Sequence, residues 1–436
     1  TSPPPEGQGL NNREFFERLV RRATEAIQTK REAIFEIDLR LRPYGKDGPR
    51  AVHIESFIEY FGRSGKAHSA ERLALIRLRP VAGDSELSRR IVAIRDQIVY
   101  ESDSIDVSEI RSLRDRQASE KVSGNKLNAK FSPGALVDLE YNVQLLQVEQ
   151  GRQHPEVRDP GIHATLRTLS ELGTIDTQEA EAMIRAYRFL RNLINGLRML
   201  RGNAQDLFLP AFDSSEALHL ARRMGYRDSD DLAAAQQLKL DFEVETAAVR
   251  SFVERHLGQD ALPTSTAGNP ADLVLSDSLS QDRIAAVLGT AGFRNPARGI
   301  VNLRRMAGPQ ENREAFARLV VLAWDYLRRS GDADMALNNW DRFTEQVTDR
   351  GAFFRELLEQ PRRLEVMISI FAGSQFLSDT LIRTPAFLEW ISDPEVITAV
   401  RSEADFRAEL DTTLSSLPDR TERLNALRRF RRREML

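Results

Sequence analysis

The sequence predicts a mainly α-helical protein, with a small mixed α/β piece at the N-terminus followed by two helical domains. Helical spacing dominates from about Glu55 onward. It is strongest in Thr177–Leu200, where apolar residues recur every three or four positions. Only Ile34–Arg42 alternates polar and apolar residues as a strand does. The chain has 436 residues, which at about 150 residues per domain allows two to four domains.

The N-terminal elements follow from local patterns. Residues 1–9 are rich in proline and glycine and predict an irregular loop. Asn12–Gln28 has the spacing of an amphipathic helix, and proline and glycine close the predicted strand Ile34–Arg42 in a loop. Asp84 or Ser85 is placed to cap the helix that follows, because a short polar side chain there accepts a backbone N–H bond.

The later elements are helices separated by turn residues. Pro133 and Gly134 predict the start of a helix whose first turn contains Asp138, where the helix dipole favours an acid. Gly258–Asp282 is polar and rich in small residues, which predicts an interdomain linker. The chain begins without methionine and stops directly after the arginine-rich run Arg428–Arg433. We therefore expect it to be a segment of a longer polypeptide.

Composition excludes several classes of protein. The 62 basic and 65 acidic residues give a net charge of -3, which argues against binding to nucleic acid or to a membrane surface through bulk charge. The chain has no cysteine, so disulfides, thiolate catalysis and cysteine-ligated metals are excluded and a cytoplasmic location is favoured. No apolar stretch approaches the roughly 20 residues of a membrane helix. We expect no nucleic-acid and no membrane partner.

The predicted strand carries the first candidate site. One of its faces presents two carboxylates and two guanidinium groups, from Glu36, Asp38, Arg40 and Arg42. A carboxylate binds hard divalent cations and arginine binds phosphate oxygens, so this face suits phosphoryl transfer. The alternative is a solvated strand face laced with ion pairs, each of which contributes about 0–1 kcal/mol.

Two further clusters have structural alternatives. Lys130–Glu140 contains a lysine and two acids, and the alternative to a site is a well-capped helix start; Asp138 and Glu140 are two apart and do not share a helix face. The arginines of Arg428–Arg433 resemble a nucleic-acid contact, but the near-neutral chain favours a helix whose arginines pair with acidic neighbours.

Several common catalytic motifs are missing from the sequence. Its six histidines are scattered without an HxxxH or HxH pair, so a histidine-based zinc site has no support. No GxSxG, GxxxxGK[ST] or GxGxxG pattern is present. The sequence therefore gives no support for a nucleophilic serine of the hydrolase type or for the two common phosphate-binding loops.

Five motifs carry a family resemblance over nearly the whole chain. They resemble, in order, the patterns FRVDLRLRPxGxxG, WERQALLKAR, GGLxDIExxVQ, FGxSxFLAD and LRRFRRR of the bifunctional glutamine synthetase adenylyltransferase/adenylyl-removing enzymes. In this sequence they stand as FEIDLRLRPYGKDG at Phe35–Gly48, ERLALIRLR at Glu71–Arg79, GALVDLEYNVQ at Gly134–Gln144, FAGSQFLSD at Phe371–Asp379 and LRRFRRR at Leu427–Arg433.

The resemblance implies an activity, a fold and partners. Members of this family transfer AMP from ATP to a tyrosine of glutamine synthetase and remove it with phosphate, giving ADP. The PII signal protein and glutamine set the balance between the two reactions. The resemblance also implies a partial polymerase-beta-like nucleotidyltransferase α/β piece at the N-terminus, followed by helical-bundle domains. Mg²⁺ or Mn²⁺ is the implied cofactor.

Site residues carry over where the motifs match. Asp38 matches a metal-binding carboxylate of the family, and Arg40 and Arg42 match the arginines beside it, so these three are expected to be catalytic. The expected nucleotide-binding residues are Arg77, Arg79 and Lys130. Three departures affect the assignment around Asp138 and Glu140 more than the family: Ala70 for a tryptophan, Ala135 for a glycine, and Leu193–Asn195 in place of a polar pattern that contains glutamate.

The family's order divides the chain into four parts. Residues 1–100 are expected to be the C-terminal part of a nucleotidyltransferase domain, and residues 101–257 a helical bundle of the PII-uridylyltransferase/adenylyltransferase type. Residues 258–282 are the linker, and residues 283–436 are expected to be the helical N-terminal part of a second adenylyltransferase repeat. On this plan the first domain is the N-terminal, adenylyl-removing one.

One departure affects activity. The family's GSxxDxD motif, which supplies two further metal-binding carboxylates, does not occur in these 436 residues. One carboxylate cannot hold two cations about 3.5–4 Å apart. We therefore expect this chain alone to be inactive and its parent protein to be the enzyme. The alternative is a non-catalytic helical scaffold that binds glutamine synthetase or PII.

Overall fold

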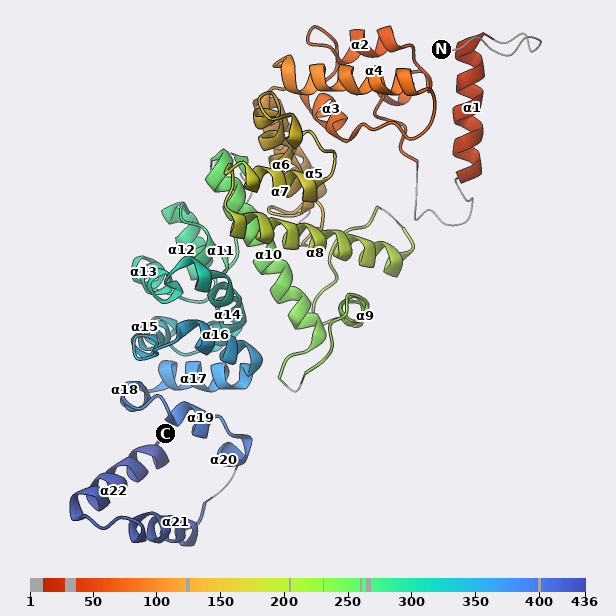
Figure 1. The fold of residues 1–436 in the computed structure, drawn as a ribbon. Helices are drawn as coiled ribbons and strands as arrows, with labels where there is room; N and C mark the ends of the chain where they lie inside the picture. Colours follow the sequence, from red (N-terminus) through yellow and green to blue (C-terminus); the bar gives the residue numbers. More distant parts are fainter. Residues whose placement is uncertain are drawn as a thin grey trace. The chain divides into compact units, whose positions relative to one another are not determined.

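The computed structural model describes residues 11–27, 37–122, 126–203, 205–229, 231–258, 261–263, 268–398 and 401–436. Within these ranges the chain is helical with connecting loops, as Figure 1 shows, and a single antiparallel bridge between Asn128 and Phe208 is the one β-type pairing. The predicted mainly α-helical class is confirmed.

The chain forms two compact units. The described parts of residues 1–226 and 248–266 make up the first unit, and those of residues 227–247 and 267–436 make up the second. One helix, α10 (Ala234–Leu257), contributes its N-terminal part to the second unit and its C-terminal part to the first. The division at residues 100, 257 and 282 stays a prediction.

The first unit contains nine further α-helices and four short helical turns in the described residues. The α-helices are α1 (Asn12–Ile27), α2 (Ile54–Phe61), α3 (Ser69–Ala74), α4 (Ser85–Asp96), α5 (Val107–Lys121), α6 (Leu136–Gly151), α7 (Ile162–Glu171), α8 (Thr177–Arg201) and α9 (Ser215–Arg223). The turns are η1 (Gly45–Asp47), η2 (Leu75–Arg77), η3 (Gln97–Glu101) and η4 (Pro155–Val157).

Local sequence signals explain where these helices begin and end. The predicted helix Thr177–Leu200 is confirmed as α8: the carboxylate of Asp176 accepts the backbone N–H of Gln178 at 2.8 Å, and Gly202 ends the helix at φ 65°. The predicted cap of α4 is Asp84, whose carboxylate accepts the N–H of Leu87 at 2.8 Å.

Helix α6 is the central element of the first unit. Twelve of its 16 residues are buried, and it packs against α7, α8, η3 and η4. Its apolar residues Leu139, Val143 and Leu146 join one hydrophobic cluster, while Leu145 joins another, formed with α2, α3 and η3. Because both faces of α6 are covered, its polar side chains must find partners inside the protein.

A buried arginine closes the loop after α2. The guanidinium of Arg72 donates to the backbone carbonyls of Phe61 at 2.9 Å, Gly62 at 2.9 Å and Gly65 at 3.0 Å, and to that of Ser104 at 3.3 Å. The residue is 6% exposed. These bonds supply the partners that carbonyls at the end of a helix lack.

The second unit is a stack of helices that follow α10. They are α11 (Asp272–Leu275), α12 (Gln281–Gly289), α13 (Pro296–Ala307), α14 (Gln310–Arg329), α15 (Ala333–Thr344), α16 (Arg350–Glu359), α17 (Pro361–Gly373), α18 (Gln375–Arg383), α19 (Phe387–Ile391), α20 (Pro394–Thr398), α21 (Glu403–Ser415) and α22 (Arg420–Glu434). From α13 to α17 each helix packs against the next but one, an arrangement visible in Figure 1.

Aromatic side chains fill the core of this stack. Phe316 on α14 lies 5.7 Å from Trp340 on α15 and 4.8 Å from Phe354 on α16, between ring centroids. All three are buried. Residues 268–282 of the predicted linker also contribute here, since Leu273 and Leu279 belong to the same core. That part of the predicted linker is therefore packed against the second unit.

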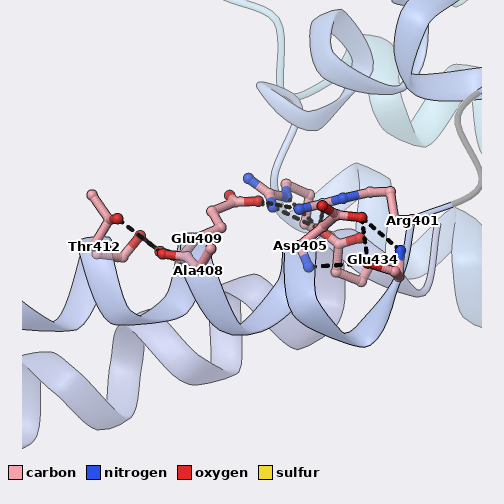
Figure 2. A network of polar contacts seen from close by, with 9 residues as sticks. Arg401, Asp405, Ala408, Glu409, Thr412 and Glu434 are labelled. Carbon is pink, nitrogen blue, oxygen red and sulfur yellow. Dashed lines mark hydrogen bonds and ion pairs between the residues drawn. The ribbon is translucent and has the colours of Figure 1, made fainter.

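An ion-pair network joins the last two helices, as Figure 2 shows. Arg401 pairs with Glu434 on α22 at 2.6 Å and also with Glu409 on α21. Glu409 in turn binds Arg433 at 2.6 Å. The interpretation of the arginine-rich run as a helix that pairs with acids is thus confirmed for Arg433, whose guanidinium also lies 4.6 Å from the ring centroid of Trp390.

The predicted strand Ile34–Arg42 is wrong for its described part. Residues 34–36 lie outside the described residues, and residues 37–42 have no regular structure. A strand needs a partner strand for its backbone hydrogen bonds, and no strand is present among the described residues. The alternating pattern therefore does not produce a strand in residues 37–42.

Candidate functional site

Asp38 and Arg40 form a tight ion pair in the loop after α1. The Asp38 carboxylate accepts the backbone N–H of Arg40 at 2.9 Å, and its two oxygens bind the guanidinium at 2.9 and 2.6 Å. The hydrogen bond from Arg40 lowers the pKa of Asp38 to about 2, although partial burial opposes the shift. The side chain of Asp38 is 54% exposed. This carboxylate is therefore ionised and accessible at neutral pH.

Arg42 shapes the loop in which it lies. Its guanidinium donates to the carbonyls of Gly48 at 3.1 Å and Lys46 at 3.0 Å, and also to that of Leu39. The loop turns at Tyr44, which has a φ of 65°. Arg42 thus positions the backbone after Asp38, and Asp38, Arg40 and Arg42 lie in one loop.

The described residues lack the group of ligands that a divalent metal needs. In the described ranges, no group of three or more histidine, aspartate or glutamate side chains is arranged to hold an ion. Asp38 stands as a single carboxylate already bound by Arg40. These residues therefore do not fit a metal site by themselves.

Arg77 and Lys130, two of the predicted nucleotide-binding residues, lie around Glu140. Arg77 on η2 pairs with the carboxylate of Glu140 on α6 at 2.8 Å. Burial lowers the pKa of Lys130, and the charges of Arg198, Arg77 and Arg191 lower it further, while Glu140 acts in the opposite direction. The structure brings these two predicted residues together, with an excess of positive charge.

Arg79 lies apart from that cluster. It lines a cavity of about 440 Å³ together with Arg95 and Asp96 of α4 and with Arg158 and Asp159. Neither Arg77 nor Lys130 lines this cavity. Asp38 and Arg42 likewise make no hydrogen bond with Arg77 or Lys130 in the described part of the chain. The predicted site residues thus fall into three separate places.

Asp138 has a structural partner in the first unit. Its carboxylate binds the guanidinium of Arg114 on α5 at 2.5 and 3.0 Å, and it accepts the N–H of Gly134 at 2.6 Å. The side chains of Arg114 and Asp138 are 4% and 1% exposed. Asp138 therefore holds the start of α6, which confirms the helix start predicted from Pro133 and Gly134.

The sequence analysis missed Arg191 and Arg198, the two arginines of α8 that contribute to the cluster around Glu140. They are seven residues apart, so they lie on the same face of the helix. That spacing was visible in the sequence. Nothing in it, however, connected this face to a lysine more than 60 residues earlier in the chain.

Sequence comparisons cover both units. A sequence model described as Glutamate-ammonia ligase adenylyltransferase matches residues 4–93 and 364–436. Another, described as GlnD PII-uridylyltransferase, matches residues 108–257. Proteins named bifunctional glutamine synthetase adenylyltransferase/adenylyl-removing enzyme align over nearly the whole chain: those of Thioalkalivibrio sulfidiphilus and Nitrosococcus oceani are each 28% identical over 98% of it. The Corynebacterium efficiens protein is 27% identical over 96%.

The chain is similar to glutamine synthetase adenylyltransferases over nearly its whole length. It spans 45% of the length of the first two of these relatives and 40% of the third. Asp38 and Arg77 fall in the segment matched by the adenylyltransferase model, whereas Lys130 and Glu140 fall in the segment matched by the uridylyltransferase model. The cluster around Glu140 therefore combines residues from two family segments.

One further property of the helices concerns membranes. Among the described helices, none combines the length and the apolar character that a membrane-spanning segment requires.

Proposed function

We propose that this chain is part of an enzyme that attaches AMP to a tyrosine of glutamine synthetase and removes it again. The observation that carries the proposal is the nearly end-to-end similarity to proteins named for both activities. In attachment the tyrosine oxygen gives up its proton and attacks the α-phosphate of ATP, the bond between the α- and β-phosphates breaks, and pyrophosphate leaves. In removal a phosphate oxygen attacks the phosphorus of AMP-tyrosine, the bond to tyrosine breaks, the tyrosine oxygen takes up a proton and ADP forms. This chain contributes to the removal reaction.

The proposed roles of the residues follow from charge. Phosphoryl transfer is catalysed mostly by positioning and by neutralising negative charge. Asp38, Arg40 and Arg42 are the proposed catalytic residues beside the reacting phosphorus. Arg77 and Lys130, and separately Arg79, are the proposed nucleotide-binding residues. The exposed position of the Asp38–Arg40 pair supports this, because a substrate can reach it.

The proposal also names a cofactor, partners and a compartment. In the whole protein, Asp38 is the residue proposed to contact Mg²⁺ or Mn²⁺. No reaction step is assigned to the ion, because the described residues by themselves do not form a metal site. Glutamine synthetase is the proposed protein substrate and ATP the proposed AMP donor. The PII signal protein and glutamine are the proposed regulators, and the cytoplasm is the proposed location.

The test is a substitution in the whole protein. Asp38→Asn should abolish phosphate-dependent release of AMP as ADP from adenylylated glutamine synthetase. The melting temperature should hardly change, because the side chain is 54% exposed. Asp47→Asn is the matched control: it removes another exposed carboxylate from the neighbouring turn and should leave the rate unchanged. Undiminished release by the Asp38 variant would show that the proposed role is wrong.

The 436-residue chain should be assayed beside the whole protein. We propose that it is inactive alone, because it supplies one of the carboxylates that the family's site requires. If the whole protein also releases no AMP but still binds glutamine synthetase or PII, the scaffold function is the correct one. Substantial release by the 436-residue chain itself would contradict the proposed inactivity.

A further inference from the structure

A small cavity lies between α5, α6 and the C-terminal end of α10, within the first unit. Its volume is about 10 Å³, which is roughly the room that one water-sized particle needs. Apolar residues of these segments form one part of the wall. The other part is polar and consists of Arg111, Arg114, Asp138, Tyr141 and Asn142. Charged and apolar side chains therefore surround a space for a single small particle.

Arg114 has one donor group that the protein does not use. Its Nε and Nη2 bind the carboxylate of Asp138 at 2.5 and 3.0 Å, and Nη2 also donates to the carbonyl of Phe131 at 2.8 Å. Its Nη1 is shielded from solvent and has no hydrogen-bond partner among the described residues. The side chain is 4% exposed. Because a buried donor without an acceptor is costly, a particle in the cavity should supply one.

Arg111 adds a second unused donor on the same side of α5. It is three residues before Arg114, so the two side chains are neighbours on the helix surface. The Nη2 of Arg111 donates to the carbonyl of Leu257, the last residue of α10, at 2.9 Å. Its Nε is shielded from solvent and, like Nη1 of Arg114, finds no partner in the described ranges. Two guanidinium groups with one unsatisfied donor each therefore border the cavity.

The charges around the cavity leave one positive charge unbalanced. Arg114 and Asp138 neutralise each other, whereas Arg111 forms no ion pair with a carboxylate in the described part of the chain. The hydroxyl of Tyr141 accepts an N–H of Gln117 at 3.4 Å, so its own proton remains free to donate. The polar wall thus combines unused donors with a surplus of one positive charge, which favours a singly charged acceptor.

Size and charge together select the occupant. A cavity of about 10 Å³ excludes sulfate, phosphate and carboxylates, because each of these anions contains several heavy atoms. Water fits the volume but carries no charge. We propose that one chloride ion binds in this cavity, accepts hydrogen bonds from Arg111 and Arg114, and thereby joins α5 to the end of α10. The proposal goes beyond the proposed function, because it involves neither a nucleotide nor a transfer reaction.

Bromide locates the ion directly. The full 436-residue chain is crystallised with bromide in place of chloride, since bromide is close to chloride in size and gives an anomalous signal. We expect an anomalous peak between the guanidinium groups of Arg111 and Arg114. A water molecule at that position in the bromide crystals, or an empty cavity, would overturn the proposal.

Amide hydrogen exchange in α5 tests the site in solution. Chloride is titrated against gluconate at constant ionic strength and pH, because gluconate is too large for the cavity. An ion that binds only the folded unit slows the exchange that requires opening of the site, by a factor that grows with the chloride concentration. We therefore expect exchange in α5 to slow about tenfold once the chloride concentration exceeds its Kd about tenfold.

Variants assign the effect to the cavity. Arg111→Gln should weaken chloride binding about tenfold or more, and Arg111→Lys should also weaken it, because lysine keeps the charge but lacks the Nε donor. Arg116→Gln is the matched control: it removes one positive charge from the exposed side of α5 and should keep the chloride dependence.

The solution experiment has its own contradicting outcomes. Exchange that does not depend on chloride in the unsubstituted chain, or a chloride dependence that both Arg111 variants retain in full, would overturn the site. Circular dichroism confirms that each variant is folded, and Arg111→Lys keeps the charge if Arg111→Gln does not fold. These results are separate from the release of AMP, which is measured on the Asp38 variant of the whole protein.

Discussion

At the scale of single residues, the Asp38–Arg40 pair makes a pH-dependent prediction. Arg40 lowers the folded-state pKa of Asp38 to about 2, whereas an unfolded aspartate titrates near about 3.9. The pairing therefore stabilises the loop above about pH 4 and is lost as the pH falls toward about 2. Arg40→Gln should raise the pKa of Asp38, measured by NMR titration of its carboxyl carbon. Arg63→Gln is the control, and a pKa that stays near about 2 in the Arg40 variant would contradict the assigned cause.

A second residue-scale prediction concerns the buried pair Arg114–Asp138. Arg114→Leu leaves the carboxylate of Asp138 buried without its cation and should lower the free energy of unfolding by about 3–5 kcal/mol. Replacing both residues by leucine should cost less than this single change, because no charge is then left alone. Denaturant titration measures both. Arg40→Leu, which breaks the exposed pair, should cost no more than about 1 kcal/mol; an equal loss in that control would show that burial does not matter here.

At the scale of elements, Glu409 is predicted to hold α21 and α22 together. It binds Arg401 and Arg433, so Glu409→Gln removes one charge from two ion pairs at once. Amide hydrogen exchange in both helices should become faster. Asp411→Asn on the exposed side of α21 is the matched control. Unchanged exchange in the Glu409 variant would mean that Glu409 does not hold the two helices together.

The helices were the part of the fold that could be predicted from the sequence. Asn12–Gln28 and Thr177–Leu200 correspond to α1 and α8 within one residue at each end, because apolar spacing of three and four residues is a local property. The prediction of a strand was wrong for the opposite reason. An alternating pattern says that a segment fits a sheet, but only pairing with a distant segment makes it one.

In the candidate site, too, the sequence predicted local contacts but not contacts between distant segments. The sequence brought out Asp38 and Arg40, which are two residues apart and meet in one turn. It could not show that Arg77 meets Glu140, because that contact depends on how η2 packs beside α6, more than 60 residues later. Arg198 was missed because an exposed-looking arginine on a long helix has no local feature that sets it apart.

At the scale of the whole molecule, the two units are predicted to lose structure separately. Phe354→Ala opens a cavity in the core of the second unit and should cost about 3–5 kcal/mol there. Hydrogen exchange should accelerate in α13–α17 while α6 and α8 keep their protection, because chains with several cores do not unfold in one step. Phe376→Ala, at a side chain that is 58% exposed, is the control. Equal loss of protection in α6 would show that both cores unfold together.

The buried guanidinium of Arg72 has a consequence for how this part of the chain can change over time. It takes the place of water for four carbonyls, three of which lie in the few residues from Phe61 to Gly65. Their directions converge on one planar group only if the number of residues between them is fixed. Side chains in this loop are therefore free to vary. An insertion or deletion of one residue, however, would turn a carbonyl away from Arg72 and leave it buried without a hydrogen-bond donor. The number of residues in this loop is therefore more tightly constrained than their identity.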